Sequence, residues 1–285
     1  MTKLTGIALG SLFVLGFFGM AAIYVWTLTH PGCSIGIQPP ANLPQPEEVW
    51  LENLHGQRLR AWYYPPQNKA AILAAGAGTG SLGDNLPPVS FLIVHGYGIL
   101  QIDQRNCANP ASPVTMGMEE FQDIEAGLAY LNTKTDVKRI GIFGFSMGGV
   151  TAIRTAARNP EIVAVLAEGG YHNMGDNIIK PDKHKSVFEN AFLYTIAGML
   201  WIYSGVNPWQ VSPVDDLATI SPRPVFLIYG EHEAESGHTR EQYDAALPPK
   251  HLWIVPGGSH GSNYLVAPEI YEVKILDFFN RTLLP

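Results

Sequence analysis

The hydrophobic pattern of the chain begins with one long apolar run near the N-terminus. Residues 4–28 contain no charged side chain and are mostly apolar. A helix of that length is long enough to cross the hydrocarbon core of a bilayer, which is about 30 Å thick. Lys3 precedes the run, and the next Lys or Arg is Arg58. Because basic residues tend to stay on the cytoplasmic side, this distribution predicts that the rest of the chain lies outside the cytoplasm.

A cleaved signal peptide is the alternative interpretation of the same run. The apolar region of a signal peptide is shorter, about 7–15 residues, so the length favours a retained single-pass membrane anchor over residues 1–28. Residues 29–48 are rich in proline, which predicts an extended linker. The globular domain is then expected to occupy residues 49–285.

Within that domain, short apolar runs alternate with segments whose apolar residues recur at helical spacing. The repeated order of strand and helix predicts an α/β fold with a mainly parallel, eight-stranded sheet and helices on both of its faces. The predicted strands are residues 49–54, 58–65, 70–77, 99–103, 139–145, 162–170, 224–231 and 251–255. The predicted helices are residues 85–95, 119–132, 147–159, 239–247 and 268–283.

Composition limits the partners that this chain could have. Lys and Arg total 18 against 25 Asp and Glu, which gives a formal charge of −7. With no basic run in the sequence, nucleic acid is not expected as a partner. The two cysteines, Cys33 and Cys107, lack the spacing of a metal site. They are interpreted as free thiols, with a disulfide as the alternative if the domain lies outside the cytoplasm.

The strongest motif is Gly144-Phe145-Ser146-Met147-Gly148, which lies between a predicted strand and a predicted helix. This G-x-S-x-G pattern is typical of a sharp strand-to-helix turn, in which side chains two positions from the serine would collide. Such a turn exposes the serine hydroxyl at the edge of the sheet, beside the N-terminus of a helix. The pattern predicts that Ser146 is a nucleophile. A structural serine in a glycine-rich turn is the alternative.

From residue 58 to residue 285 the sequence resembles the α/β-hydrolase superfamily. It is most similar to the serine-hydrolase branch that includes dienelactone hydrolases and the S9 and S33 peptidase families. The resemblance rests on residues 115–149, which contain the G-x-S-x-G motif, and on the segments 221–233 and 252–261. It implies an α/β-hydrolase fold and a triad in the chain order serine, acid, histidine. It implies no metal or organic cofactor.

The run His95-Gly96-Tyr97-Gly98 is similar to an HGxG oxyanion loop, but its position argues against that role. A parallel crossover needs at least about 10–12 residues, whereas the next predicted strand begins at Ile99. We therefore interpret residues 85–95 as the crossover helix, with His95 as its last residue and Gly96 as its C-terminal glycine.

The resemblance then assigns the oxyanion donors to backbone groups. They are the N–H of Met147, directly after the serine, and the N–H of Ala77, with Gly78 as the alternative to Ala77. Asp103 and Arg105 match the D-x-R of the family and are expected to brace their loop rather than to react.

The predicted base is His260, because it follows the strand at 251–255 and a glycine-rich turn. A surface loop histidine is the alternative. The acid is expected just after the strand at 224–231, where three glutamates lie close together in the sequence. Glu233 occupies the last position of the family's G-x-x-D pattern, and Glu231 and Glu235 remain alternatives.

Residues 171–214, inserted before the strand at 224–231, are rich in aromatic residues and leucine. They are interpreted either as an apolar cap over the serine or as a helix pair that is buried or pressed against the bilayer.

The sequence therefore predicts a membrane-anchored serine hydrolase of ester, thioester or amide bonds, acting on a small-molecule or lipid-like acyl substrate. A serine peptidase of the S9 or S33 type is the second interpretation. A non-catalytic binding module on the same fold is the third. Protein partners are not specified by the sequence.

Overall fold

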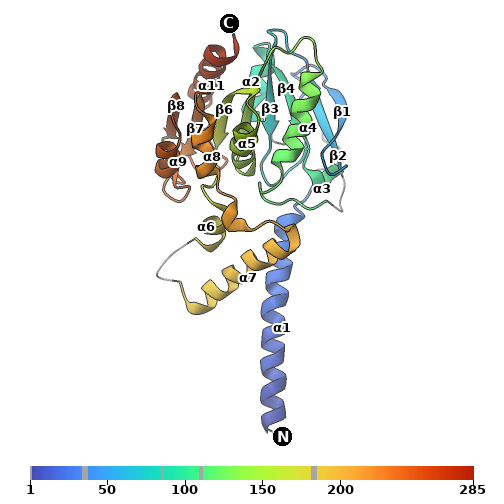
Figure 1. The fold of residues 1–285 in the computed structure, drawn as a ribbon, viewed down its shortest axis with the longest axis vertical. Helices are drawn as coiled ribbons and strands as arrows, with labels where there is room; N and C mark the ends of the chain where they lie inside the picture. Colours follow the sequence, from blue (N-terminus) through green and yellow to red (C-terminus); the bar gives the residue numbers. More distant parts are fainter. Residues whose placement is uncertain (1, 34–37, 85–86, 109–111, 181–184) are drawn as a thin grey trace.

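The computed structural model describes residues 2–33, 38–84, 87–108, 112–180 and 185–285. Within them, eight strands form one sheet with helices on both faces, and helix α1 (Thr2–Thr29) projects from one end of this domain (Figure 1). The strands are β1 (Glu47–Glu52), β2 (Arg58–Tyr64), β3 (Ala70–Ala75), β4 (Gly98–Ile102), β5 (Arg139–Phe145), β6 (Ile162–Glu168), β7 (Val225–Gly230) and β8 (Lys250–Val255).

The order of the strands across the sheet is β1-β2-β4-β3-β5-β6-β7-β8. Strand β2 runs antiparallel to β1 and β4, and the pairings from β4 to β8 are all parallel. The predicted mainly parallel, eight-stranded sheet is therefore confirmed. Because parallel strands end at the same edge, the loops after β3, β5, β6, β7 and β8 meet there, which is where open α/β sheets bind ligands.

Two hydrophobic cores lie on the two faces of the sheet. Successive residues of a strand point to opposite faces, so Leu73 of β3 belongs to one core and Ile72 to the other. The first core is covered by α4 (Phe121–Asn132), α5 (Met147–Arg158), α8 (Pro213–Ile220) and α9 (Thr239–Ala245). The second is covered by α2 (Pro87–Val94) and α11 (Pro268–Leu283). The remaining helices are α3 (Arg105–Ala108), α6 (Met174–Ile179), α7 (Val187–Ser204), the 3₁₀ turn η1 (Pro208–Gln210) and α10 (Asn263–Val266).

The segment around His95 closes helix α2. The helix ends at Val94, one residue earlier than predicted, and residues 85–86 of the predicted helix lie outside the described residues. Gly96 has a φ of 83°, and the N–H of Tyr97 donates to the carbonyl of Leu92 at 3.0 Å. This is the glycine-terminated helix end that the sequence predicts. Residues 95–98 therefore share their residue types with an oxyanion loop, but not its position in the fold.

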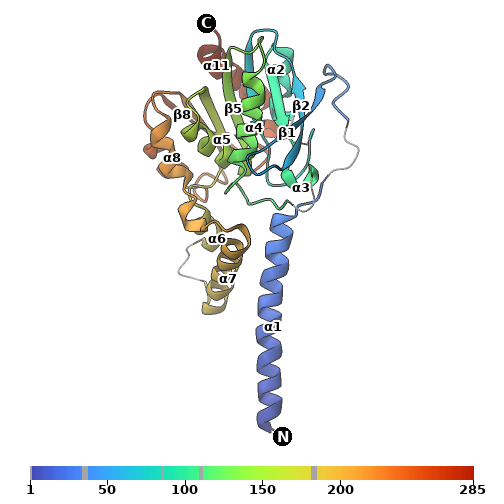
Figure 2. The same ribbon diagram turned by 45° about the vertical axis from the view of Figure 1, so that its right-hand side comes forward.

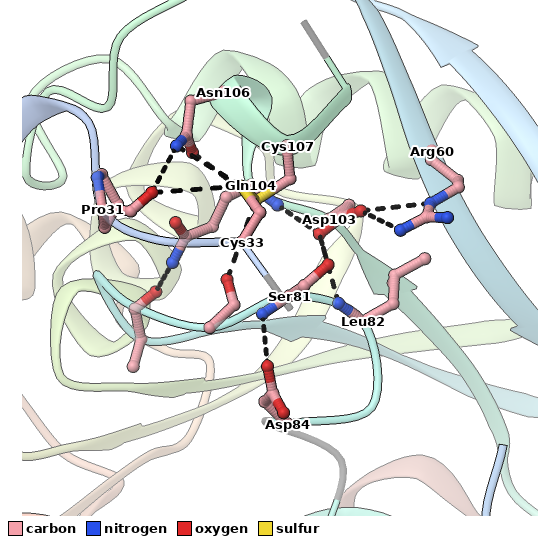
Figure 3. Close-up of a disulfide and its surroundings, with 12 residues drawn as sticks. Pro31, Cys33, Arg60, Ser81, Leu82, Asp84, Asp103, Gln104, Asn106 and Cys107 are labelled. Atoms are coloured by element: carbon pink, nitrogen blue, oxygen red, sulfur yellow. Dashed lines mark hydrogen bonds and ion pairs between the residues drawn. A yellow bond between two sulfur atoms is a disulfide. The ribbon is translucent and has the colours of Figure 1, made fainter. Parts of the chain in front are cut away.

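The two cysteines are joined. Cys33 and Cys107 form a disulfide across a sequence separation of 74 (Figure 3), so the interpretation of two free thiols is wrong and the alternative holds. Beside it, the Asn106 side-chain amide donates to the carbonyl of Pro31 at 2.8 Å. These contacts fix the segment that follows α1 to α3, the short helix after β4.

Asp103 and Arg105 brace loops, as predicted. The buried carboxylate of Asp103 accepts hydrogen bonds from Ser81 Oγ at 2.8 Å and from the guanidinium of Arg60 at 2.8 Å (Figure 3). Arg105, also buried, donates to Asp123 at 2.9 Å. Asp103 thus holds the loop after β3 against β2, and Arg105, the first residue of α3, ties α3 to α4.

The insertion between β6 and β7 forms α6, α7, η1 and α8. Helix α7 packs against α1, where Ala21 and Val25 of α1 form a small buried cluster with Ile196 and Leu200 of α7. Figures 1 and 2 both show α6 and α7 at the end of the domain from which α1 projects.

Candidate active site

Ser146 sits at a sharp turn between β5 and α5. Its φ of 57° and ψ of −119° are strained for a residue with a side chain. The turn requires glycine on either side, because a Cβ at Gly144 would overlap the carbonyl of Gly148, and a Cβ at Gly148 would overlap the carbonyl of Ala75. The hydroxyl is consequently presented at the carboxyl edge of the sheet, as the motif predicts.

His260 reaches this serine from the loop after β8. Its Nε2 lies 2.9 Å from Ser146 Oγ, a hydrogen bond between residues 114 positions apart in the chain. The loop contains Gly257 with a φ of 68° and Gly261 with a φ of 81°, values that favour glycine. These glycines let the loop bend so that the imidazole faces the serine.

Glu233 stands behind the imidazole. Its Oε2 lies 2.7 Å from His260 Nδ1, and its Oε1 accepts a hydrogen bond from the N–H of Gly230 at 2.9 Å. The other two glutamates do not join this group: Glu231 accepts from the backbone N–H of Gly257 at 2.8 Å, and Glu235 is exposed. Of the three predicted acids, Glu233 is the one hydrogen-bonded to the imidazole.

Hydrogen bonds shift the pKa values of both Glu233 and His260. Burial acts to raise the pKa of Glu233, but hydrogen bonds from His260 and from the N–H of Gly230 outweigh it and lower that pKa overall. The hydrogen bond to Glu233 raises the pKa of His260, although burial opposes it. A carboxylate that stays ionised beside the ring stabilises an imidazolium, so this arrangement allows the ring to take a proton from Ser146.

The predicted oxyanion donors flank the serine. Met147 opens α5 directly after Ser146, and Ala77 follows β3 with its carbonyl accepting from the Gln104 side chain at 2.6 Å. In the part of the chain that the structure describes, the N–H groups of Met147 and Ala77 have no acceptor in the protein. A Cβ built on Gly78 would lie 3.7 Å from Met147 Cβ, so residue 78 also approaches the turn.

A pocket of about 620 Å³ has Ser146 and His260 in its lining. Cavities of that size commonly hold small organic ligands. Met116 and Tyr171 contribute to its wall, where the Tyr171 hydroxyl donates to the Met116 carbonyl at 2.7 Å. The lining extends to Lys185, the residue before the N-cap of α7.

Known proteins show the same sequence pattern and fold. Residues 107–191 match a family profile described as the dienelactone hydrolase family. The chain is 31% identical to an uncharacterized protein of Mycobacterium tuberculosis, over 88% of this chain and 84% of the relative. It is 24% identical to the α/β-hydrolase domain-containing protein WAV2 of Arabidopsis thaliana, over 97% of this chain and 92% of the relative.

Among solved structures, the esterase Pf2001 of Pyrococcus furiosus matches with a TM-score of 0.69 and 24% identity, over 89% of this chain and 98% of the esterase. The chain belongs to the α/β-hydrolase superfamily. An acylaminoacyl peptidase of Pyrococcus horikoshii also shares the fold, with a TM-score of 0.62 and 19% identity, and this chain covers 42% of the peptidase.

The most notable site residue of this α/β-hydrolase that the sequence did not reveal is Glu168. It ends β6, and its backbone carbonyl accepts from the N–H of Ser146 at 2.7 Å. Its side chain is buried and accepts hydrogen bonds from Asn263 at 2.9 Å and from Tyr271 at 2.5 Å. Burial raises its pKa to about 7, although these hydrogen bonds act to lower it. The one feature of the sequence that could have pointed to Glu168 is its place as an acidic residue at the carboxyl end of a core strand.

One cluster on the pocket wall of this α/β-hydrolase could hold a metal ion. His172, His238 and Glu241 each offer a ligand atom, and these atoms lie within 4.8 Å of one another. Both histidines already face carboxylates, because His172 lies 3.4 Å from Asp176, outside the cluster, and His238 lies 3.3 Å from Glu241, within it. The two imidazole rings stack at 3.8 Å. The arrangement around Ser146 does not depend on this cluster.

Proposed function

We propose that this protein is a membrane-anchored serine hydrolase that cleaves carboxylic ester, thioester or amide bonds. The observation that carries the proposal is the continuous hydrogen-bond chain from Ser146 through His260 to Glu233, at 2.9 Å and 2.7 Å. A nucleophile, a base and a group that orients the base are the minimum set for acyl transfer. Their position at the carboxyl edge of an α/β-hydrolase sheet supports the same conclusion.

In the proposed mechanism, Ser146 Oγ attacks the substrate carbonyl while its proton passes to His260 Nε2. The negative charge that develops on the carbonyl oxygen is stabilised by the N–H groups of Met147 and Ala77, with Gly78 as the alternative second donor. The imidazolium, stabilised by Glu233, then protonates the leaving alcohol, thiol or amine. Water, activated by the neutral imidazole, hydrolyses the acyl-enzyme and returns the proton to the serine. No cofactor is needed for these steps.

The anchor is proposed to be α1, retained in the mature protein. Residues Ile7–Thr29 form a helix long and apolar enough to span a membrane, with a mean hydropathy of 2.1. A signal sequence has the same properties, but Ala21 and Val25 are buried against the domain's own helix α7. That packing favours a helix that stays with the folded domain.

The hydrolase domain is proposed to lie outside the cytoplasm. The disulfide between Cys33 and Cys107 supports this, because such bonds persist in oxidising compartments and are rare in the cytosol. Lys3 on the far side of α1 agrees with the same orientation.

An ester is the favoured substrate, since the family profile that matches is that of dienelactone hydrolases. The test is hydrolysis of 4-nitrophenyl esters and of aminoacyl-4-nitroanilides by purified full-length protein, with Ser146→Ala as the matched control. Ester turnover that disappears in Ser146→Ala supports the proposal. Preference for the nitroanilides would identify a peptidase instead, and folded protein that cleaves neither class would favour a binding module.

A further inference from the structure

Helix α7 is unusually apolar for a helix on the surface of a domain. Among its eighteen residues Glu189 is the one charged side chain. Several of its large apolar or aromatic residues are nevertheless exposed, including Val187 at 87% and Ile202 at 86%. A group of exposed apolar side chains of this kind marks contact with another apolar phase. The other exposed large residues of α7 are Phe188, Tyr194, Trp201 and Tyr203.

The contacts of α7 with α1 show how far along α1, and so how deep in a membrane spanned by α1, each end of α7 would lie. At one end, the ring of Tyr203 lies 6.3 Å from that of His30, just after α1. At the other end, Phe188 lies 5.3 Å from Phe17. Phe17 precedes Thr29 by twelve residues, about 18 Å along a helix, and one leaflet of the hydrocarbon core is about 15 Å thick. If α1 spans a bilayer with Thr29 at the surface of the hydrocarbon core, α7 therefore extends from that surface through the full depth of one leaflet.

The ends of α7 suit these two depths. Trp201 and Tyr203 lie near its C-terminal end, as Tyr24 and Trp26 do in α1, and such rings prefer the interface. At the deeper end, two charged side chains have internal partners, which lowers the cost of placing them in a membrane. Glu189 accepts from the N–H of Ser186 at 2.8 Å, and the ammonium group of Lys185 donates to the carbonyls of Ile179 and Lys180.

An apolar groove of about 460 Å³ lies between the two helices. Six of its seven lining residues are apolar or aromatic, and the seventh is Thr29; the lining consists of Ala22, Val25, Trp26, Thr29, Met199, Ile202 and Tyr203.

The orientation of the domain above the membrane is fixed by ties at the end of α1. The disulfide of Cys33 and the hydrogen bond from Val114 N–H to the Thr29 carbonyl, at 2.8 Å, join this end to the domain. The pocket that contains Ser146 then extends toward the bilayer, since its lining includes Lys180 and Lys185, and Lys185 lies two residues before the start of α7. The pocket and the deeper end of α7 therefore meet.

We propose that α7 lies embedded in one leaflet beside α1, and that the pocket takes the acyl ester of a membrane lipid directly from that leaflet. The second half of this inference rests on the proposed hydrolase function, and the first half does not. The occupant of the exposed face of α7 is bilayer lipid, because the same face continues onto α1.

Depth-dependent quenching tests the position of α7. Both native cysteines are in the disulfide, so the thiol of Ile202→Cys can be labelled with an environment-sensitive nitrobenzoxadiazole dye in the full-length protein. Leu54→Cys, at a site 84% exposed in the turn between β1 and β2, is the matched control. In phosphatidylcholine vesicles, doxyl groups on the acyl chains should quench the dye at 202 and not at 54. Equal quenching at the two sites, or quenching of both by aqueous iodide alone, overturns the inference.

Kinetics test the lipid substrate. The rates to compare are those on a long-chain acyl ester incorporated in vesicles and on water-soluble 4-nitrophenyl acetate. In the double variant Val187→Glu and Ile202→Glu, the ratio of the two rates should fall by about tenfold or more, because each new charge disfavours immersion. Leu54→Glu should leave the ratio unchanged, and an unchanged ratio in the double variant contradicts the inference.

The two proposals fail in different ways. Lipid quenching at 202 in a protein that cleaves neither ester supports the embedded helix and contradicts the hydrolase function. Cleavage of the soluble ester without quenching at 202 supports the function and contradicts the embedded helix.

Discussion

His260 Nε2 lies 2.9 Å from Ser146 Oγ, although 114 residues separate the two in the chain. The contact exists because β5 and β8 are parallel strands of one sheet, so the loops that follow them meet at the same edge. A serine hydroxyl has no need of a distant imidazole for its own stability at this edge. In the proposed mechanism this pairing serves proton transfer, and several measurable consequences follow from the groups around it.

The pH dependence of ester hydrolysis should report His260. The ring must be neutral to accept the serine proton, and its hydrogen bond to Glu233 raises its pKa above the ordinary value of 6.5. kcat/KM should therefore rise with pH along a curve whose midpoint lies above 6.5. In Glu233→Gln the midpoint should move to lower pH. A midpoint that is identical in the variant would show that Glu233 does not act on this imidazole.

The identity of the acid can be tested with neighbouring glutamates as controls. Glu233→Gln should lower kcat by about 10²–10⁴, because the ring loses the group that orients it and stabilises its charged form. Glu231→Gln removes a carboxylate that contacts the backbone of Gly257 and not the ring, so its kcat should stay close to that of the unchanged protein. A larger loss in Glu231→Gln than in Glu233→Gln would reverse the assignment.

Glu168 should make stability depend on pH. Its pKa is about 7 in the folded protein against 4.5 when unperturbed, so the folded state holds this proton more tightly. The stability from the protonated group is complete below pH 4.5 and is lost as the pH rises through 7. At about 1.4 kcal/mol per pKa unit, the loss amounts to roughly 3 kcal/mol.

Glu168→Gln removes that proton equilibrium and keeps a neutral side chain of similar size. The free energy of unfolding, measured by urea denaturation in detergent from pH 4.5 to 8, should therefore fall less with pH in the variant than in the unchanged protein. Parallel curves for the two proteins would mean that Glu168 does not bind a proton in this range.

The disulfide should contribute measurably to stability. It closes a loop with a sequence separation of 74, and bonds of this kind commonly contribute about 2–4 kcal/mol by restricting the unfolded chain. The paired substitutions Cys33→Ser and Cys107→Ser should lower the unfolding midpoint, whereas a reductant should lower it in the unchanged protein and not in the variant. Equal unfolding midpoints in all samples would show that the disulfide does not contribute to stability.

The elements that follow local rules were predictable from the sequence. The glycines at 144 and 148 are required by backbone collisions within a few residues, so the turn at Ser146 has a local signature. The same holds for Gly96, whose positive φ closes α2 and separates His95 from any oxyanion role. Spacing and chain order then led to His260, because the loops of parallel strands share an edge.

Features that arise from tertiary contact were not predictable in this way. The pairing of Cys33 with Cys107 depends on the path of the chain between α1 and the loop after β4. The raised pKa of Glu168 depends on its burial in the folded domain, which outweighs the hydrogen bonds that Asn263 of α10 and Tyr271 of α11 donate to it. The sequence shows that the segments of α1 and α7 are each apolar, but it does not show that the two helices pack against each other.

The most direct measurement is covalent labelling of the folded, full-length protein with a fluorophosphonate probe, followed by peptide mass spectrometry. These reagents need a serine whose hydroxyl is activated by a base, which is the role proposed for His260 at 2.9 Å from Ser146 Oγ. The account predicts one probe per chain on Ser146, abolished by Ser146→Ala and strongly slowed by His260→Ala. Folded protein that takes up no probe, or takes it up equally well without His260, would contradict it.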